Sequence, residues 1–173
     1  VFLVIERLSE LKHILELSRK HDHMPMLGVR VKLYSYGEGK WASSSGENSK
    51  FGLNTMEVVK LCTELKELEI GDHLRLLHFH MGSQIPDIRT IKRALVEASQ
   101  FYCQISRMGF PLGYLDVGGG LAIDYDGTRT REWSSMNYTM EQYARDVVFN
   151  IKEICDHHKI QEPHILSESG RAI

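Results

Sequence analysis

The sequence predicts an α/β fold, an incomplete (β/α)8 TIM barrel in which about five parallel strands alternate with four helices. Two observations predict it. Short apolar runs alternate with longer amphipathic segments along the 173 residues, and crossover helices make successive strands parallel. Chemically active residues also follow the carboxyl ends of four expected strands, and a barrel gathers such ends at one mouth. A doubly wound sheet fits the alternation as well, but it would bring fewer of these residues together.

The first half of the chain predicts three strands and two helices. VFLVI at 1–5 and MLGVRVKL at 26–33 are apolar and rich in β-branched residues, which is typical of buried strands. Between them, leucine and isoleucine recur at helical spacing over 9–20. Thr55 is expected to cap the second helix, and LRLLHFHM at 74–81 predicts the third strand.

The second half repeats the alternation. Apolar residues at helical spacing predict helices over about 88–108 and 140–158. GYLDV at 113–117 predicts the fourth strand, which three glycines end, and HIL at 164–166 begins a short fifth. No shift in composition marks a domain boundary, so we expect residues 1–173 to form one unit. Because the chain starts directly in a strand, we expect it to be an excised fragment of a larger barrel domain.

Composition excludes several classes of protein. With 42% hydrophobic and 25% charged residues, the chain is typical of a packed globular domain. Its 21 basic and 23 acidic side chains leave a formal charge of −2, which gives no electrostatic case for nucleic acid or an anionic membrane as partner. Three widely spaced cysteines support neither a disulfide framework nor a CxxC zinc site. We therefore expect a cytoplasmic protein with reduced thiols.

The triple glycine at 118–120 is the first candidate site. Three successive amides without side chains can turn toward an anion and hold a phosphate, although a tight turn alone is an equal alternative. The spacing is not that of the GxGxxG dinucleotide motif. HMGSQ, which ends the third strand segment, adds the imidazole of His80 and the hydroxyl of Ser83. We expect His78 and His80 to point to opposite faces of their strand, so that only one of them enters the site.

The last strand end supplies a carboxylate beside a guanidinium, in Glu168 and Arg171 with Gly170 between them. A surface ion pair is the alternative interpretation. In a barrel mouth, the carboxylate could meet a cationic ring nitrogen while the arginine meets an anion. A ligand with one phosphate and one protonatable ring nitrogen satisfies both, and pyridoxal phosphate is such a ligand. The polar segment DYDGTRTR at 124–131 is more simply a solvated loop, and it lacks the remaining ligands of an EF-hand.

Taken together, these motifs closely resemble the bacterial biosynthetic arginine decarboxylases, pyridoxal-phosphate enzymes of the alanine-racemase-like fold. The motifs that carry the resemblance occur in the expected order, and they are LGVRVKL (27–33), GKWASSSGENSKFGL (39–53), HFHMGSQ (78–84), LDVGGGLAIDYDGTRT (115–130) and SESGRAI (167–173). The shorter elements also belong to ornithine and diaminopimelate decarboxylases, whereas GKW, SKFGL and DYDGTR look particular to the arginine enzymes.

The resemblance implies a role for each candidate residue. His80 would stack on the pyridine ring, and Glu168 would bond the ring nitrogen; both would act in catalysis. Arg30 matches a position near the cofactor's phenolic oxygen. The phosphate would be held by Ser83, Gly118, Gly119, Gly120, Gly170 and Arg171. Magnesium is commonly required in the family, but the sequence assigns it no ligands.

The implied activity is decarboxylation of L-arginine to agmatine and CO2 in polyamine biosynthesis. The resemblance also implies that the strand with the Schiff-base lysine precedes residue 1 and that a carboxyl-terminal β-domain follows, so we expect the fragment alone to be inactive. The full-length protein is expected to form a homo-oligomer, a dimer or larger. The alternatives are a decarboxylase of ornithine, lysine or diaminopimelate, or a catalytically silent homologue that binds a partner protein, as antizyme inhibitors do.

Overall fold

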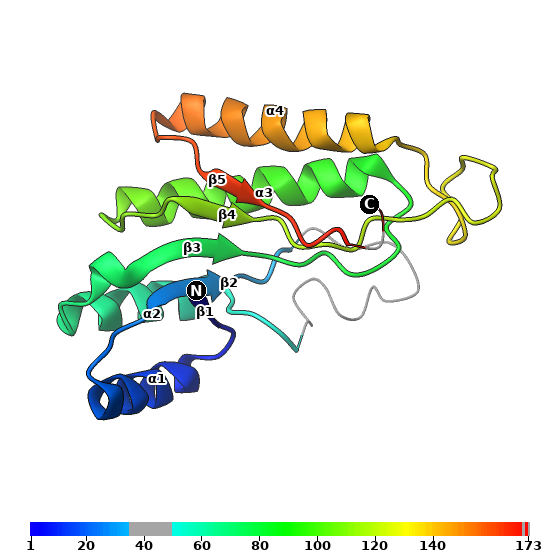
Figure 1. Cartoon of the computed structure of the whole chain (residues 1–173). Coiled ribbons are helices and arrows are strands. Elements are labelled where there is room, and N and C mark those ends of the chain that lie inside the picture. The colour runs from blue at the N-terminus through cyan, green and yellow to red at the C-terminus, as the bar shows by residue number, and fades with distance from the viewer. Residues whose placement is uncertain (35–49, 171, 173) are drawn as a thin grey trace.

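A computed structural model of the chain describes residues 1–34, 50–170 and 172. Within these residues, five strands form one sheet in the order β1-β2-β3-β4-β5, and each neighbouring pair is parallel. The strands are β1 (Phe2–Ile5), β2 (Met26–Arg30), β3 (Leu74–His78), β4 (Tyr114–Asp116) and β5 (His164–Leu166). The α-helices are α1 (Leu8–His21), α2 (Thr55–Glu67), α3 (Ile88–Arg107) and α4 (Met140–His158), and a 3-10 turn, η2 (Gly71–His73), precedes β3. The predicted alternation of five parallel strands with four helices is confirmed (Figure 1).

The second helix begins at a different cap from the predicted one. Asn54, not Thr55, is the N-cap of α2, and its side-chain oxygen accepts a hydrogen bond from the Glu57 amide at 2.9 Å. The Glu57 carboxylate in turn accepts one from the Asn54 amide at 2.9 Å. This reciprocal pair is a capping box, which satisfies two amides that the first helical turn leaves free. Thr55 is therefore the first helical residue.

Two strands end well before the position that the sequence predicts. β2 ends at Arg30 and β3 at His78, where 33 and 81 were expected. Beyond Arg30 the chain leaves the ladder to pair with another segment, because the Leu53 carbonyl accepts from the Lys32 amide at 2.8 Å. These early ends release the residues that follow into loops, so that they gather at the carboxyl edge, meaning the edge of the sheet where the strands end.

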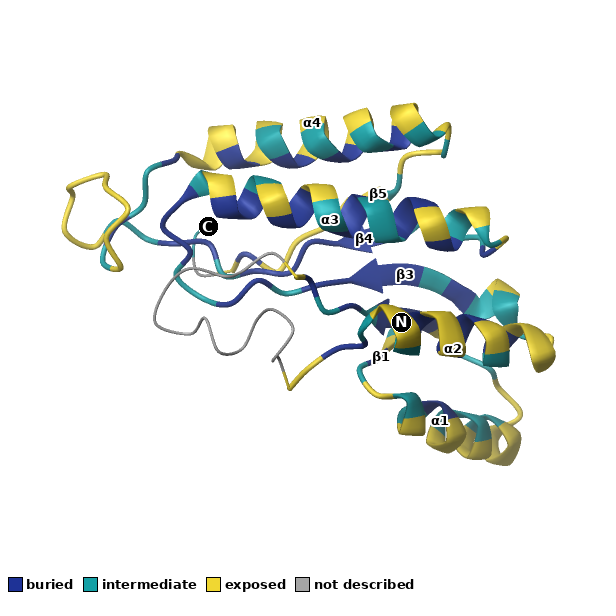
Figure 2. Cartoon of the chain, turned by 180° about the vertical axis from the view of Figure 1, so that it is seen from behind, coloured by how far each residue is buried: buried dark blue, intermediate teal, exposed yellow. Residues whose placement is uncertain are grey.

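The helices cover one face of the sheet. Figures 1 and 2 show α1 to α4 on the same side of the strands, and their buried surfaces face the sheet. Leu27, Val29, Leu77 and Leu115 lie in this interface with no solvent exposure. Burial of this apolar layer is the main stabilising contribution to the fold. Among the described residues, no helix is both long enough and apolar enough to span a membrane.

The opposite face is concave. The rings of Phe2 on β1 and Tyr114 on β4 lie 4.9 Å apart, although β2 and β3 separate their strands. In a flat sheet such strands would lie about 14 Å apart. Gly28 makes room for this curvature, because a Cβ there would meet Leu76 at 2.8 Å and Val4 at 3.2 Å. The sheet therefore curves as a barrel wall does, with these residues on its inner side.

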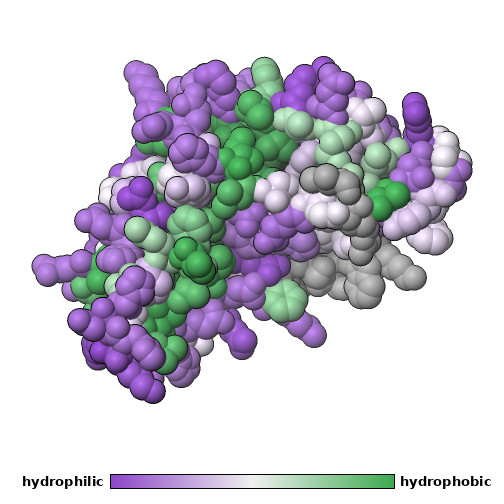
Figure 3. All heavy atoms as spheres, viewed as in Figure 1, coloured by the Kyte–Doolittle hydropathy of each residue, from purple (hydrophilic) through white to green (hydrophobic). Residues whose placement is uncertain are grey.

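The edge strands expose apolar side chains. Leu3 and Val4 on β1 are 43% and 37% exposed, and Ile165 and Leu166 on β5 are 36% and 38% exposed. Figure 3 shows apolar side chains gathered in a band over the strands, between α4 and α1. In a closed barrel such edges are paired with further strands.

Candidate functional site

A cavity of about 180 Å³ lies at the carboxyl edge. Its walls come from three loops that are far apart in the sequence, after β3, β4 and β5. Four of the predicted site residues line it, namely His80, Ser83, Gly120 and Glu168. The prediction that separate strand ends converge on one site agrees with this arrangement.

The triple glycine lies where these loops touch. A Cβ at Gly118 would meet the Phe79 carbonyl oxygen at 2.6 Å, and one at Gly119 would meet the Glu168 carbonyl oxygen at 2.6 Å. At Gly120 the clash would be with the Gly82 carbonyl oxygen, at 1.9 Å. Gly118 and Gly120 also have positive φ angles of 65° and 88°, which favour glycine. The turn is therefore a tight one, and it brings the three loops into van der Waals contact.

The same turn presents free hydrogen-bond donors. The Gly118 amide donates to Asp116 Oδ1 at 2.9 Å. Within the described part of the chain, the amides of Gly119 and Gly120 donate to no acceptor. Unpaired amides beside a cavity are costly unless water or a ligand accepts from them, and successive amides with alternating backbone signs form an anion-binding nest. The geometry fits a phosphate at this turn.

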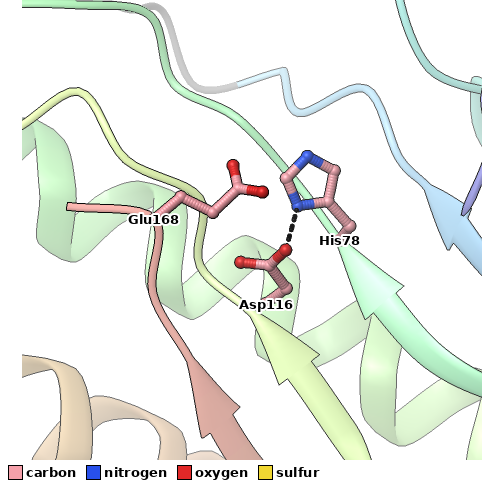
Figure 4. A group of neighbouring side chains, drawn as sticks. All are labelled: His78, Asp116 and Glu168. Carbon is pink, nitrogen blue, oxygen red and sulfur yellow. Dashed lines mark ion pairs between the residues drawn. The ribbon is translucent and has the colours of Figure 1, made fainter. Parts of the chain in front are cut away.

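His78 at the end of β3, Asp116 at the end of β4 and Glu168 just after β5 form a cluster (Figure 4). His78 Nδ1 lies 3.0 Å from Asp116 Oδ2, and one ligating atom of each of the three residues lies within 4.8 Å of the others. His78 and Asp116 are buried, whereas Glu168 is exposed. The His78–Asp116 pair is at ion-pair distance without hydrogen-bond alignment, since Nδ1 has no hydrogen-bond partner among the described residues.

The expectation that His78 and His80 point to opposite faces was wrong. His78 lies in the cluster with Glu168, and His80 lines the cavity with the same glutamate. The expectation misread the strand period, since side chains two residues apart on a strand share a face. In the structure β3 ends at His78, and His80 lies in the loop that follows. Asp116 was missed altogether, although its place two residues before the triple glycine at a strand end was a usable signal.

His80 lies in an environment that favours its neutral form. Burial is the largest cause that lowers its pKa, followed by the charges of Arg30 and His78. Glu168 and Asp116 oppose this shift. A neutral imidazole at the wall of the cavity is suited to stacking on an aromatic ring rather than to pairing with an anion.

The remaining predicted residues lie less centrally. Arg30 donates to Glu6 Oε1 at 2.5 Å and lies over the Phe51 ring at 5.2 Å, so its guanidinium is held beside the site by its own partners. Gly170 is exposed, with open space where a Cβ would be. Arg171 and the segment GKW at 39–41 lie outside the described residues.

Comparison with known proteins places the chain in a family. The profile of the family described as "Pyridoxal-dependent decarboxylase, pyridoxal binding domain" matches residues 1–173. The biosynthetic arginine decarboxylase of Prochlorococcus marinus (strain MIT 9515) is 50% identical over 171 residues, which cover 99% of this chain and 26% of that protein. The corresponding protein of Citrifermentans bemidjiense is 46% identical over 172 residues, covering 99% of this chain and 27% of that one.

Solved structures of pyridoxal-dependent decarboxylases have the same fold as this chain. The biosynthetic arginine decarboxylase SpeA from Campylobacter jejuni aligns with a TM-score of 0.84 at 37% identity, over 98% of this chain and 27% of that one. Diaminopimelate decarboxylase from M. jannaschii shares the fold, with a TM-score of 0.81 at 22% identity over 99% and 38% of the two chains. This chain thus spans only 26% to 27% of the length of the curated relatives. With its five parallel strands and converging loops, the chain belongs to the pyridoxal-dependent decarboxylases, as part of their pyridoxal-binding barrel domain.

Proposed function

We propose that the intact protein is a pyridoxal-phosphate-dependent arginine decarboxylase that releases CO2 from L-arginine and forms agmatine, in polyamine biosynthesis. Identity of 50% to a biosynthetic arginine decarboxylase supports the substrate. The observation that carries the chemistry is the position of Glu168, whose side chain lines the same cavity as Gly120 of the free-amide turn. A ligand with a phosphate at one end and a ring nitrogen at the other fits these two features.

The residues divide into two groups around such a ligand. The amides of the glycine turn, with Ser83, Gly170 and Arg171, would hold the phosphate. Glu168 would bond the ring nitrogen, His80 would stack on the ring, and Arg30 would lie near the phenolic oxygen. When bound, pyridoxal phosphate accepts the electron pair that CO2 loss leaves on the α-carbon. The Glu168 carboxylate would keep a proton on the ring nitrogen by stabilising its charged form, which favours decarboxylation.

The parts of the protein outside this chain complete the proposal. We expect a preceding barrel strand to supply the lysine that binds the cofactor covalently, and a following β-domain to complete the site. Exposed apolar residues on β1 and β5 support further barrel strands at both edges. A homo-oligomer, a magnesium requirement and a cytoplasmic location belong to the same proposal.

Substrate preference is tested with the full-length protein. Purified protein is incubated with arginine, ornithine, lysine or diaminopimelate, and released CO2 is measured. Release that is fastest with arginine is the expected result, and preference for another amino acid would overturn the substrate assignment. To separate an enzyme from a silent homologue, the full chain is treated with borohydride, which should fix pyridoxal phosphate to a lysine. Absence of cofactor absorbance and of fixation would favour the silent homologue.

A further inference from the structure

We propose that His78 and Asp116 form a positioning pair that links the two ends of the cofactor site, the glycine turn and the Glu168 carboxylate. The inference rests on the proposed function and extends it to two residues that need not touch the ligand. Asp116 would act through Gly118, and His78 would act through Asp116.

Asp116 has a separate partner for each of its carboxylate oxygens. Oδ1 accepts a hydrogen bond from the Gly118 amide at 2.9 Å, and Oδ2 lies 3.0 Å from His78 Nδ1. His78 and Asp116 are paired in register on β3 and β4, and each side chain is only 11% exposed. The carboxylate is thus fixed between a strand side chain on one side and the start of the glycine turn on the other.

Gly118 carries this link to the last strand. Its carbonyl accepts from the Glu168 amide at 2.9 Å, while its own amide donates to Asp116. Ser167 Oγ also donates to the Gly118 carbonyl, at 3.4 Å. The backbone of one glycine is therefore held from both sides, by the residue we place behind the site and by the residue we place at the ring nitrogen.

The charges of the cluster agree with this role. Two carboxylates within 4.8 Å of each other repel when both are ionised. His78 Nδ1 lies 3.0 Å from Asp116 Oδ2, whereas the Glu168 side chain lines the cavity. His80 is near enough to feel the charges of Arg30 and of the two carboxylates, and Arg30 itself pairs with Glu6. A metal ion bound by His78, Asp116 and Glu168 is the competing assignment, but it would occupy the carboxylate that lines the cavity.

The test measures pyridoxal phosphate affinity of the intact apoprotein by fluorescence titration, together with the turnover of the loaded protein. Asp116→Ala should weaken affinity about tenfold or more, because the Gly118 amide loses a charged acceptor. Asp116→Asn keeps an oxygen for that amide and should restore affinity to within about twofold of wild type, the scatter of a neutral change. Because the charge is gone, its turnover should stay below that of wild type. Equal affinities in wild type and Asp116→Ala would overturn the inference.

His78 supplies a second, independent arm. His78→Ala should weaken cofactor affinity and lower turnover, and His78→Asn, which keeps a polar side chain beside Asp116, should recover part of both. If both residues act through one carboxylate, the loss of affinity in the double alanine variant will fall below the product of the single losses. Multiplicative losses, or no loss in either His78 variant, would contradict the pairing.

Matched controls separate this role from stability and from the competing assignments. Asp146 pairs with Lys92 at 3.1 Å and is 14% exposed, and it lies on α4 away from the cavity. Asp146→Ala should leave cofactor affinity unchanged, and an equal loss there would show a general folding effect and overturn the inference. A stoichiometric metal in the wild-type protein, whose removal by chelator abolishes cofactor binding, would overturn it as well. If wild type itself binds no pyridoxal phosphate, the proposed function fails; if it binds but the variants match it, only the positioning pair fails.

Discussion

Acidic side chains lie both at the end of β4, in Asp116, and in the loop after it, in Asp124 and Asp126, and they differ in what holds them. Asp124 and Asp126, in the exposed loop, accept from near neighbours: Asp126 accepts from Thr128 Oγ1 at 2.7 Å, and Asp124 from Ser135 Oγ at 2.5 Å. Asp116 instead lies beside His78, which is 38 residues away on another strand. The carboxylates of Asp124 and Asp126 find their hydrogen-bond donors within their own loop, whereas the His78 neighbour of Asp116 is brought close only by the fold.

The difference teaches which acids belong to a site. Hydrogen bonds from Ser134 and then Thr128 lower the pKa of Asp126 to about 2, so this carboxylate is already satisfied by its loop. Glu168 keeps its side chain toward the cavity, where it can act on a ligand. A motif such as LDVGGGLAIDYDGTRT therefore contains residues of both kinds, and only the spatial partners separate them.

The largest expected effect is that of Gly120→Ala in the full-length protein. The new Cβ would lie 1.9 Å from the Gly82 carbonyl, at a φ of 88°. We expect a loss of about 3 kcal/mol or more of folding free energy, together with loss of cofactor binding. Gly127→Ala is the matched control, since Gly127 also has a positive φ of 72° but no neighbour within 4 Å. It should cost only about 1–2 kcal/mol, and equal costs in denaturant melts would contradict the close packing of the turn.

Glu168→Gln should separate chemistry from binding. Loss of the charge at the ring nitrogen should lower kcat by about tenfold or more, or about 1.4 kcal/mol, while cofactor affinity changes little. Steady-state kinetics and a cofactor titration measure the two effects. Asp126→Asn in the loop is the control and should change neither. Unchanged turnover in Glu168→Gln would show that this carboxylate does not tune the ring.

Asp87→Ala should affect stability alone. Asp87 caps α3, where it accepts from the Arg89 amide at 3.0 Å, and loss of such a cap costs about 1 kcal/mol. Hydrogen bonding from Arg89 is the largest cause that lowers the Asp87 pKa to about 2. Because the folded pKa lies below the ordinary 3.8, this stabilisation is present above pH 3.8 and is lost as pH falls toward 2. Melts of the variant should show a smaller dependence over that range, and a loss of cofactor affinity would contradict the separation.

The smallest expected effect is in the titration of His80. NMR of the ring protons in the apoprotein should show a midpoint below the ordinary 6.5, because burial disfavours the charged form. The stabilisation from this group is present above pH 6.5 and is lost as pH falls through the lower, folded value. A midpoint above 6.5 would contradict this, because it would show that the charges of Glu168 and Asp116 outweigh burial.

The sequence was sufficient to predict the helices and strands and most of the residues that gather at the carboxyl edge. Among the described residues, apolar periodicity located the five strands and four α-helices, because burial of one face sets that pattern, but it did not indicate η2. It missed Asn54, because Thr55 is also a good cap, and it missed the early end of β2, because pairing with Leu53 is a tertiary event. The place of Asp116 before the triple glycine was a usable signal, but its contact with His78 could not be predicted locally, since His78 comes from another strand. The sharing of one face by His78 and His80 was predictable from strand geometry and was wrongly assigned.

The most direct test of the central claim is the protonation state of the ring nitrogen. Full-length protein is loaded with pyridoxal phosphate labelled with ¹⁵N in the ring, and the ¹⁵N chemical shift is measured at neutral pH in wild type and in Glu168→Gln. A protonated nitrogen in wild type and an unprotonated one in the variant is the predicted result. The same shift in both proteins would contradict the placement of Glu168 at the ring.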